Sequence, residues 1–270
     1  MDLGWARAGI DTVLQAENDP RCLSVLTRHY PNVRRVNDVR VLNSNYEHAV
    51  LDGVELIHGG FPCQGISAGR DKHGAGGIAS DPRSALWWEF ARIIGEVQPE
   101  FVLIENVERI RNGRGGQDFR TVVEELRRLN YVGSGIVLDA AAFNLPARRP
   151  RVFFVARRAF RPTRGVVASQ RVAECLIRND VGRFVLEGTR QPRAEDSGAA
   201  RPTRGSYRLL TPRECERAMG WPDDWTRWDA SGKEIANTHR YRMIGNGVAA
   251  PVAEWLGHRL MELKGNSNGE

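Results

Sequence analysis

The sequence predicts an α/β fold in which the strands of a parallel sheet alternate with helices. Apolar runs of strand length occur at 12–16, 54–57, 101–104, 135–138 and 152–156, and helical apolar periodicity covers 83–97 and 119–129. The run at 101–104 is apolar throughout, which is typical of a strand buried on both faces of a parallel sheet. Strands and helices in alternation favour such a sheet. A length of 270 residues suits one large domain, or one domain with a small appendage.

Helix-start signals mark two further elements. Asp19 and Pro20 form an N-cap and first turn directly after the strand at 12–16. Thr211, Pro212 and Glu214 form the pattern of a capping box, which predicts a helix from that point. A last helix is expected over 251–263.

Composition places limits on the partners and the compartment. There are 39 Lys and Arg against 33 Asp and Glu, a formal net charge of +6, which is compatible with a polyanionic partner. The four cysteines form no CxxC metal motif, so no metal site is predicted, and a chain of this size needs no disulfide framework. No apolar run reaches the length of a signal peptide core or a membrane span. The prediction is a cytoplasmic protein without a membrane partner.

Cys63 is the first candidate for chemistry. It lies in the segment GGFPCQGIS, just past the strand expected at 54–57, on a loop stiffened by proline and preceded by two glycines. A thiol presented in this way suits a nucleophile, which needs exposure and a fixed direction. The alternative is a buried cysteine acting as a small apolar side chain.

Glu105 is the second candidate. With Asn106 it is expected to follow the strand at 101–104. The carboxyl ends of parallel strands meet at one edge of a sheet, where ligands bind, so we expect Glu105 to share a site with Cys63. The alternative is a simple turn.

Six ordered segments together resemble the DNA (cytosine-5) methyltransferases. They are GGFPCQGIS, DPRSALWWEF, IENV, FNLPARRPRVFFVA, LTPRECERAMGWPDDW and MIGNGVAAPVAEWLG, in that order, and the likeness covers nearly the whole chain apart from 160–207. The resemblance implies a Rossmann-like sheet that binds S-adenosylmethionine. It also implies transfer of a methyl group to C5 of cytosine in duplex DNA, with the target base flipped out of the helix.

The same resemblance assigns catalytic roles. Cys63 would add to C6 of the base, and Glu105 would protonate or hydrogen-bond N3, a role that a raised pKa at a strand end would favour. Arg149 and Arg151 match the basic pair that contacts the flipped cytosine and its phosphate. Ala147 departs from the family, which usually has glutamine there.

Cofactor positions follow from the resemblance in the same way. Glu17 would accept hydrogen bonds from the ribose hydroxyls, and Asp38 would contact the adenine. The other positions implied for S-adenosylmethionine, towards its methyl and methionine end, are Pro62, Leu86, Asn246 and Val248.

Contacts to DNA are expected from two segments. Gln64 and Ser67 lie on the loop that closes over DNA in the family. Residues 160–207 contain nine arginines, no lysine and five acidic residues, and stand where family members have a target-recognition domain. This short, irregular region is predicted to contact phosphates through arginines, with a solvated linker as the alternative; the arginines are Arg161, Arg164, Arg201 and Arg204. The domain prediction is therefore a catalytic and cofactor-binding domain (1–159), a target-recognition region (160–207) and a C-terminal segment that packs back on the first domain (208–270).

The start of the chain departs from the family pattern. Family members begin with a strand and a glycine-rich F-x-G-x-G-G turn, whereas this chain opens at MDLGWARAG, which matches the helix after that turn. The sequence therefore predicts a sheet whose first, normally central strand is missing. Two other functions stay open at this stage, a tRNA cytosine-5 methyltransferase and a catalytically silent DNA-binding remnant. A monomer associated with the nucleoid is predicted.

Overall fold

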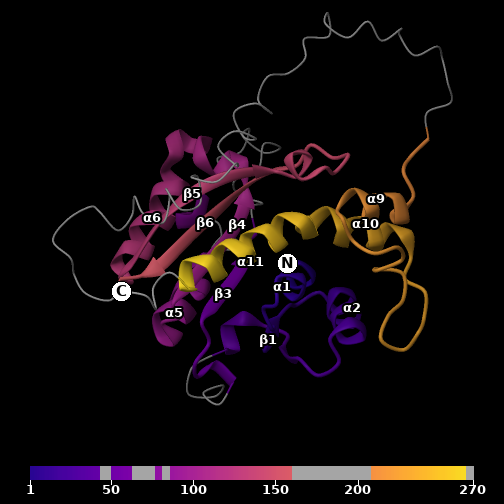
Figure 1. Ribbon diagram of the computed structural model, residues 1–270, viewed down its shortest axis with the longest axis horizontal. Helices are drawn as coiled ribbons and strands as arrows, with labels where there is room; N and C mark the ends of the chain where they lie inside the picture. Colours follow the sequence, from indigo (N-terminus) through magenta and orange to yellow (C-terminus); the bar gives the residue numbers. More distant parts are fainter. Residues whose placement is uncertain (43–49, 63–76, 81–85, 160–207, 266–270) are drawn as a thin grey trace, which may run out of the picture.

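The computed structural model describes residues 1–42, 50–62, 77–80, 86–159 and 208–265 (Figure 1). The main sheet has four strands in the order β3-β4-β6-β5. Strands β3 (Leu56–Gly60) and β4 (Phe101–Val107) run parallel, whereas β6 (Pro150–Arg158) is antiparallel to both of its neighbours, β4 and β5 (Tyr131–Asp139).

The expectation of an all-parallel sheet is therefore wrong at β6. Parallel strands need a crossover of a dozen or more residues, usually a helix. Only ten residues connect β5 to β6, and they include the short 3-10 helix η5 (Ala140–Phe143). A connection of that length returns the chain antiparallel, so the sheet is mixed.

A second sheet holds only β1 (Leu14–Ala16) and β2 (Arg34–Val36), paired in parallel. No strand of the described residues joins it to the four-stranded sheet. The two sheets meet through side chains instead, since Leu14 and Ile57 pack against one small cluster formed by Leu42, Leu51 and Ile93.

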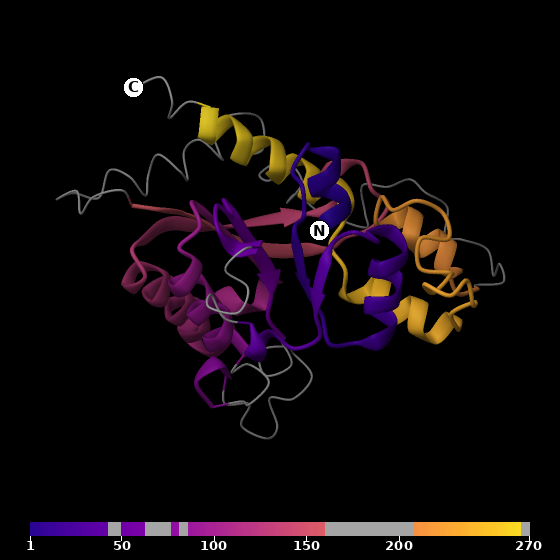
Figure 2. The same cartoon turned by 90° about the horizontal axis from the view of Figure 1, so that it is seen from below.

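Helices cover both faces of the main sheet (Figures 1 and 2). Phe101 and Leu103 of β4 face α1 (Asp2–Arg7) and α11 (Ala250–Gly265), and their neighbours Val102 and Ile104 face α5 (Leu86–Val97) and α6 (Gln117–Arg128). Because β4 alternates its side chains between two apolar layers, each of these four residues is at most 3% exposed. The apolar run at 101–104 predicted this burial.

Both helix-start signals are confirmed. The Asp19 side chain accepts a hydrogen bond from the Arg21 amide at the start of α2 (Pro20–His29). The complete capping box of Thr211 and Glu214 begins α9 (Pro212–Ala218). The sequence did not predict α10 (Asn237–Asn246), which begins after Ala236 without a side-chain cap.

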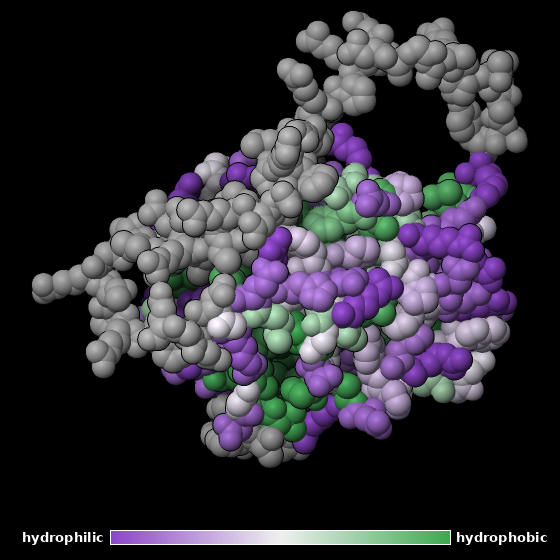
Figure 3. Space-filling model, in the orientation of Figure 1, coloured by the Kyte–Doolittle hydropathy of each residue, from purple (hydrophilic) through white to green (hydrophobic). Residues whose placement is uncertain are grey.

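The C-terminal part of the described chain packs on the sheet. Residues from α11 and Met219 belong to the same apolar cluster as Phe153 and Val155 of β6. The Lys264 ammonium is also paired with Glu55, just before β3. In the orientation of Figure 1, a largely hydrophilic band crosses the middle of the surface over α11 (Figure 3). None of the described helices is long and apolar enough to cross a membrane. The domain boundaries stay a prediction.

The packing of α1 on α11 makes a testable prediction at Gly4. A Cβ added there would lie 2.5 Å from the Ala253 Cβ and 2.6 Å from the Ala250 carbonyl oxygen. Alanine normally stabilises a helix relative to glycine by about 1 kcal/mol. Here overpacking of about 1–3 kcal/mol outweighs that gain, so we expect Gly4→Ala to lower the free energy of unfolding measured by urea denaturation.

Gly265→Ala is the matched control, because it ends α11 and nothing lies within 4 Å of its added Cβ. Its stability should equal or slightly exceed that of the native chain. Equal stabilities of the Gly4→Ala variant and the native chain would contradict the close contact between α1 and α11.

Candidate active site

The candidate site lies where β3 and β4 end side by side. Gly60, the last residue of β3, pairs with Glu105 of β4. A Cβ on Gly60 would lie 3.0 Å from the Glu105 Oε2 and 3.2 Å from its carbonyl oxygen, so a larger residue there would require the carboxylate to shift. Phe61 and the half-buried Pro62 follow, and the next residue is Cys63, which lies outside the described residues.

Glu105 and Asn106 were expected after their strand, and this expectation is wrong. Strand β4 continues to Val107 because β6 pairs with it along its whole length, with Glu105 opposite Phe153 and Val107 opposite Arg151. Glu105 is therefore held by strand pairing on both sides. A carboxylate so placed has a more fixed direction than one on a turn.

Arg151 on β6 is the partner of Glu105. Its Nε lies 3.0 Å from the Glu105 Oε1, and the two side chains are 21% and 15% exposed. Burial raises the pKa of Glu105 above its usual range, and the charges of Arg151 and Arg149 limit that rise. The structure therefore brings together three of the four predicted catalytic residues and gives the carboxyl group the raised pKa expected of an acid.

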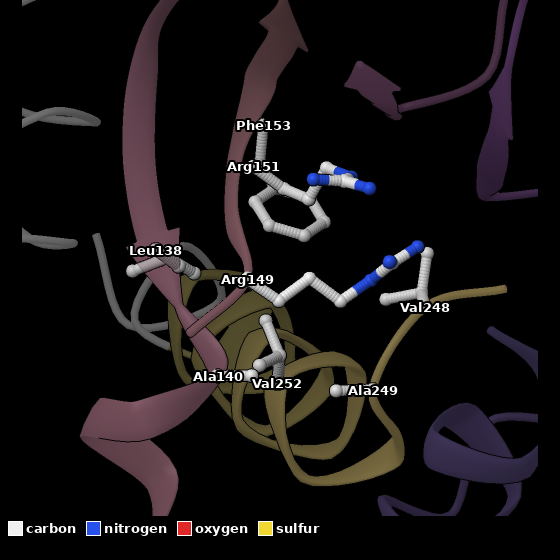
Figure 4. Close-up of a pocket in the computed structure, with 8 residues that line it drawn as sticks. All are labelled: Leu138, Ala140, Arg149, Arg151, Phe153, Val248, Ala249 and Val252. Carbon is white, nitrogen blue, oxygen red and sulfur yellow. The ribbon is translucent and has the colours of Figure 1, made fainter. Parts of the chain in front are cut away.

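Arg149 has a different set of contacts. One nitrogen, Nη2, donates hydrogen bonds of 2.7 Å to the carbonyl oxygens of Gly245, at the end of α10, and Gly247, in the connection between α10 and α11. Burial, with the neighbouring charge of Arg151, lowers the pKa of Arg149 to about 10, so it remains protonated at neutral pH. Figure 4 shows both guanidinium groups extending to the same side of β6, with Arg149 reaching toward Val248.

The Trp221 side chain also contacts the connection between α10 and α11. Its Nε1 donates to the Val248 carbonyl oxygen at 3.0 Å, and its ring covers Gly247, where an added Cβ would lie 2.4 Å from two ring carbons. Val248 is buried and Asn246 is exposed. The segments 220–222 (GWP) and 245–248 (GNGV) therefore pack against each other, a contact that the sequence analysis did not predict.

Asn106 is a buried residue beside Glu105 to which the sequence analysis assigned no role. It is 2% exposed, and its side-chain amide donates to the Phe61 carbonyl oxygen at 3.3 Å, while its Oδ1 accepts from the Val107 amide at 2.9 Å. Asn106 thus ties the end of β4 to the chain two residues before Cys63. Its position next to Glu105 was the only available signal.

The two acids predicted to hold the nucleoside lie directly after β1 and shortly after β2. Glu17 accepts a 2.8 Å hydrogen bond from the Asp19 amide through one carboxylate oxygen, and its own amide donates to the Val36 carbonyl. Asp38 forms a two-pronged pair with Arg40, and hydrogen bonds from this arginine lower the pKa of Asp38 to about 2. Carboxylate oxygens that follow parallel strands can accept hydrogen bonds from ribose hydroxyls or from an adenine amino group. These two side chains therefore fit the nucleoside of the expected cofactor.

Two of the four cysteines lie in the described part of the chain, and neither is activated. Burial raises the pKa of Cys22 to about 12, with Glu17 and Asp19 adding to the effect. Burial also raises the pKa of Cys215. Both are therefore thiols at neutral pH and poor nucleophiles.

Of the remaining predicted site residues, the structure describes only Leu86. Leu86 is the first residue of α5 and is half-buried. The predicted DNA contacts lie outside the described residues: Gln64, Ser67, Arg161, Arg164, Arg201 and Arg204.

The fold and this edge of the sheet define the class of protein as a Rossmann-like α/β methyltransferase. A putative DNA modification methyltransferase encoded within an E. coli prophage has the same fold, with a TM-score of 0.64 and 22% identity, covering 97% of this chain and 95% of that one. The S. pombe Dnmt2 methyltransferase superposes with a TM-score of 0.62 and 18% identity over 97% of this chain and 95% of its own.

The family match identifies the protein more specifically than the fold does. The model of the C-5 cytosine-specific DNA methylase family matches residues 1–174 and 178–262, and the chain belongs to that family. It is 27% identical to the type II methyltransferase M2.BsuMI of Bacillus subtilis, covering 98% of this chain and 74% of the relative. It is 26% identical to the type II methyltransferase M.NgoMIV of Neisseria gonorrhoeae, covering 96% and 93%. The reaction of this chain is therefore methylation of cytosine in DNA.

Proposed function

We propose that the chain methylates C5 of cytosine in duplex DNA through a covalent adduct on Cys63, with the target base flipped into the site. The observation that carries this proposal is the half-buried Glu105–Arg151 pair beside Gly60, three residues before Cys63 in the chain. A base inside a duplex cannot reach such an edge without leaving the stack.

The chemistry requires groups of the kinds found at this edge. The Cys63 thiolate forms a bond to C6, and Glu105 gives a proton or hydrogen bond to N3, so that electrons gather at C5. C5 would then take the methyl group as its bond to the donor sulfur breaks. The C5 proton passes to solvent, the Cys63 thiolate leaves C6 and any proton on N3 returns to Glu105, which restores the aromatic ring. Arg151 orients Glu105, and Arg149 with Arg151 supplies positive charge beside the base and its phosphate.

The methyl group comes from S-adenosylmethionine, as the family implies. Glu17 and Asp38 would hold the nucleoside, and the methionine end would lie near Pro62, Leu86, Asn246 and Val248. These assignments are supported by the position of both acids after parallel strands and by the anchoring of Val248 by Trp221.

We further propose a monomer in the cytoplasm, on chromosomal DNA, serving as the modification enzyme of a restriction–modification system. The type II names of the relatives support that last role. The segment 160–207 would contact phosphates through Arg161, Arg164, Arg201 and Arg204, and Gln64 and Ser67 would approach the flipped base.

The test is methyl transfer from tritiated S-adenosylmethionine to duplex DNA, followed by bisulfite sequencing to locate the modified base. We expect label at C5 of cytosine when duplex DNA is the only acceptor, and none when tRNA is the only acceptor. Label in tRNA but not in DNA would favour the tRNA enzyme. Absence of transfer to either acid, with DNA binding retained, would favour the silent remnant.

A further inference from the structure

We infer that a basic turn after β4, formed by Arg111, Arg114 and Arg120, binds phosphates of the DNA next to the target cytosine. The inference rests on the proposed function and extends it to described residues that neither the family pattern nor the arginine-rich segment 160–207 had indicated.

The turn lies beside the candidate site. Strand β4 ends at Val107, two residues after Glu105, and the 3-10 helices η3 (Glu108–Arg111) and η4 (Gly113–Gly116) follow at once. The short helix α4 (Gly77–Ser80) lies against the same turn and the start of α6. A Cβ on Gly77 would overlap the Arg114 guanidinium, and the Ile78 amide donates to Asp118 at 2.9 Å. Arg114 therefore lies against α4 as well as following β4, the strand that carries Glu105.

The backbone of the turn has an unusual conformation that presents a side chain. Arg114, Gly115 and Gly116 all have positive φ, at 52°, 64° and 75°. Glycine adopts this region freely, whereas an arginine there is strained. Backbone strain held at an edge of this kind is commonly retained for function. At position 114 the chain keeps a long cationic side chain where glycine would relieve the strain.

Buried and backbone contacts hold the cations in place. Asp118 is 3% exposed, and its Oδ1 lies 3.5 Å from the Arg114 Nη1, while the Arg114 side chain is 36% exposed. Arg120 donates to the Gly115 carbonyl oxygen at 2.8 Å, and Arg111 is exposed. The Arg114 Nη2 also donates to the Gln117 Oε1 at 3.3 Å. A guanidinium has five N–H donors, so those that these contacts do not use remain for a ligand.

The charge of the turn indicates an anionic partner. Residues 108–120 contain four arginines and two acids, and one of the acids is the buried Asp118. The exposed side of the turn is therefore basic. Guanidinium groups match phosphate oxygens in geometry, and this enzyme family acts on DNA, whose backbone is a regular array of phosphates. The recognised groups are phosphates, so binding at this turn should not depend on base sequence.

The experiment measures the salt dependence of duplex binding by fluorescence anisotropy for Arg111→Gln with Arg120→Gln. Each lost phosphate contact should reduce the slope of log K against log salt by about 0.9. Affinity should fall by the same factor for unrelated duplex sequences. Arg114→Gln is tested separately, with its unfolding curve, because this substitution leaves Asp118 without its arginine.

The matched control is Arg127→Gln with Arg128→Gln, at the other end of the same helix. α6 has 12 residues and is about 18 Å long, so these exposed arginines lie away from the site. The control should keep the native slope. Equal slopes in the two double variants, with a Cys63 adduct still trapped on 5-fluorocytosine DNA, would overturn this inference and leave the proposed function standing. A native chain that neither binds DNA nor forms the adduct would overturn both.

Discussion

Replacing Cys63 with serine is expected to reduce methyl transfer to background while DNA binding stays measurable. A hydroxyl is far less nucleophilic than a thiolate, and no other described cysteine can replace it, because burial raises the pKa of both Cys22 and Cys215. Duplex DNA containing 5-fluorocytosine provides the direct readout. The fluorine at C5 cannot leave as a proton does, so the native chain should remain bonded to C6 and migrate as a denaturation-resistant complex.

Cys215→Ser is the control for this experiment. Cys215 is half-buried in α9 and packs against the main apolar cluster. The control should keep both the rate and the adduct, apart from a small loss of stability. An adduct that persists in Cys63→Ser would show that another residue is the nucleophile.

Glu105→Gln should lower the rate of methyl transfer by about 10²–10⁴-fold, the usual contribution of a general acid. The substitution keeps the shape of the side chain and removes the proton that Glu105 would give to N3. Cofactor affinity, measured by calorimetry, should change little. A native rate in this variant would exclude the role of Glu105.

The pH dependence has a definite sign. Burial raises the pKa of Glu105, so its protonated form persists to higher pH than in an ordinary glutamate. The native rate should therefore fall as the pH rises through this raised pKa, and Glu105→Gln should lose that part of the profile. Glu100→Gln is a matched control, because Glu100 immediately precedes the same strand and pairs with Arg157 at 2.7 Å. Its rate and pH profile should be native.

Local signals in the sequence predicted local structure well. The caps at Asp19 and Thr211 act within three residues, and the structure confirms both. The apolar run at 101–104 predicted a strand buried on both faces, because that burial depends on side-chain composition alone.

Features set by distant partners were harder to predict. The extension of β4 past Glu105 depends on pairing with β6, some 50 residues later, and the reversed direction of β6 depends on the length of the connection before it. The bonds from Arg149 to Gly245 and Gly247 link positions 96 and 98 residues apart. Motif order placed Glu105, Arg149 and Arg151 in one site, but only the fold shows that the first and last are paired.

The divided sheet separates the chain into regions of unequal local stability. The strands β4 and β6 have partners on both sides, whereas β1 and β2 have three residues each and, within the described part of the chain, pair only with each other. Few hydrogen bonds resist opening of the small sheet, so it can unfold locally while the larger sheet stays intact. Glu17 and Asp38 lie at the ends of these short strands. A ligand held by those two carboxylates would bind only when the small sheet is folded. Its binding energy would therefore stabilise that sheet against local unfolding, so that the nucleoside-binding region and the catalytic half would unfold as one cooperative unit.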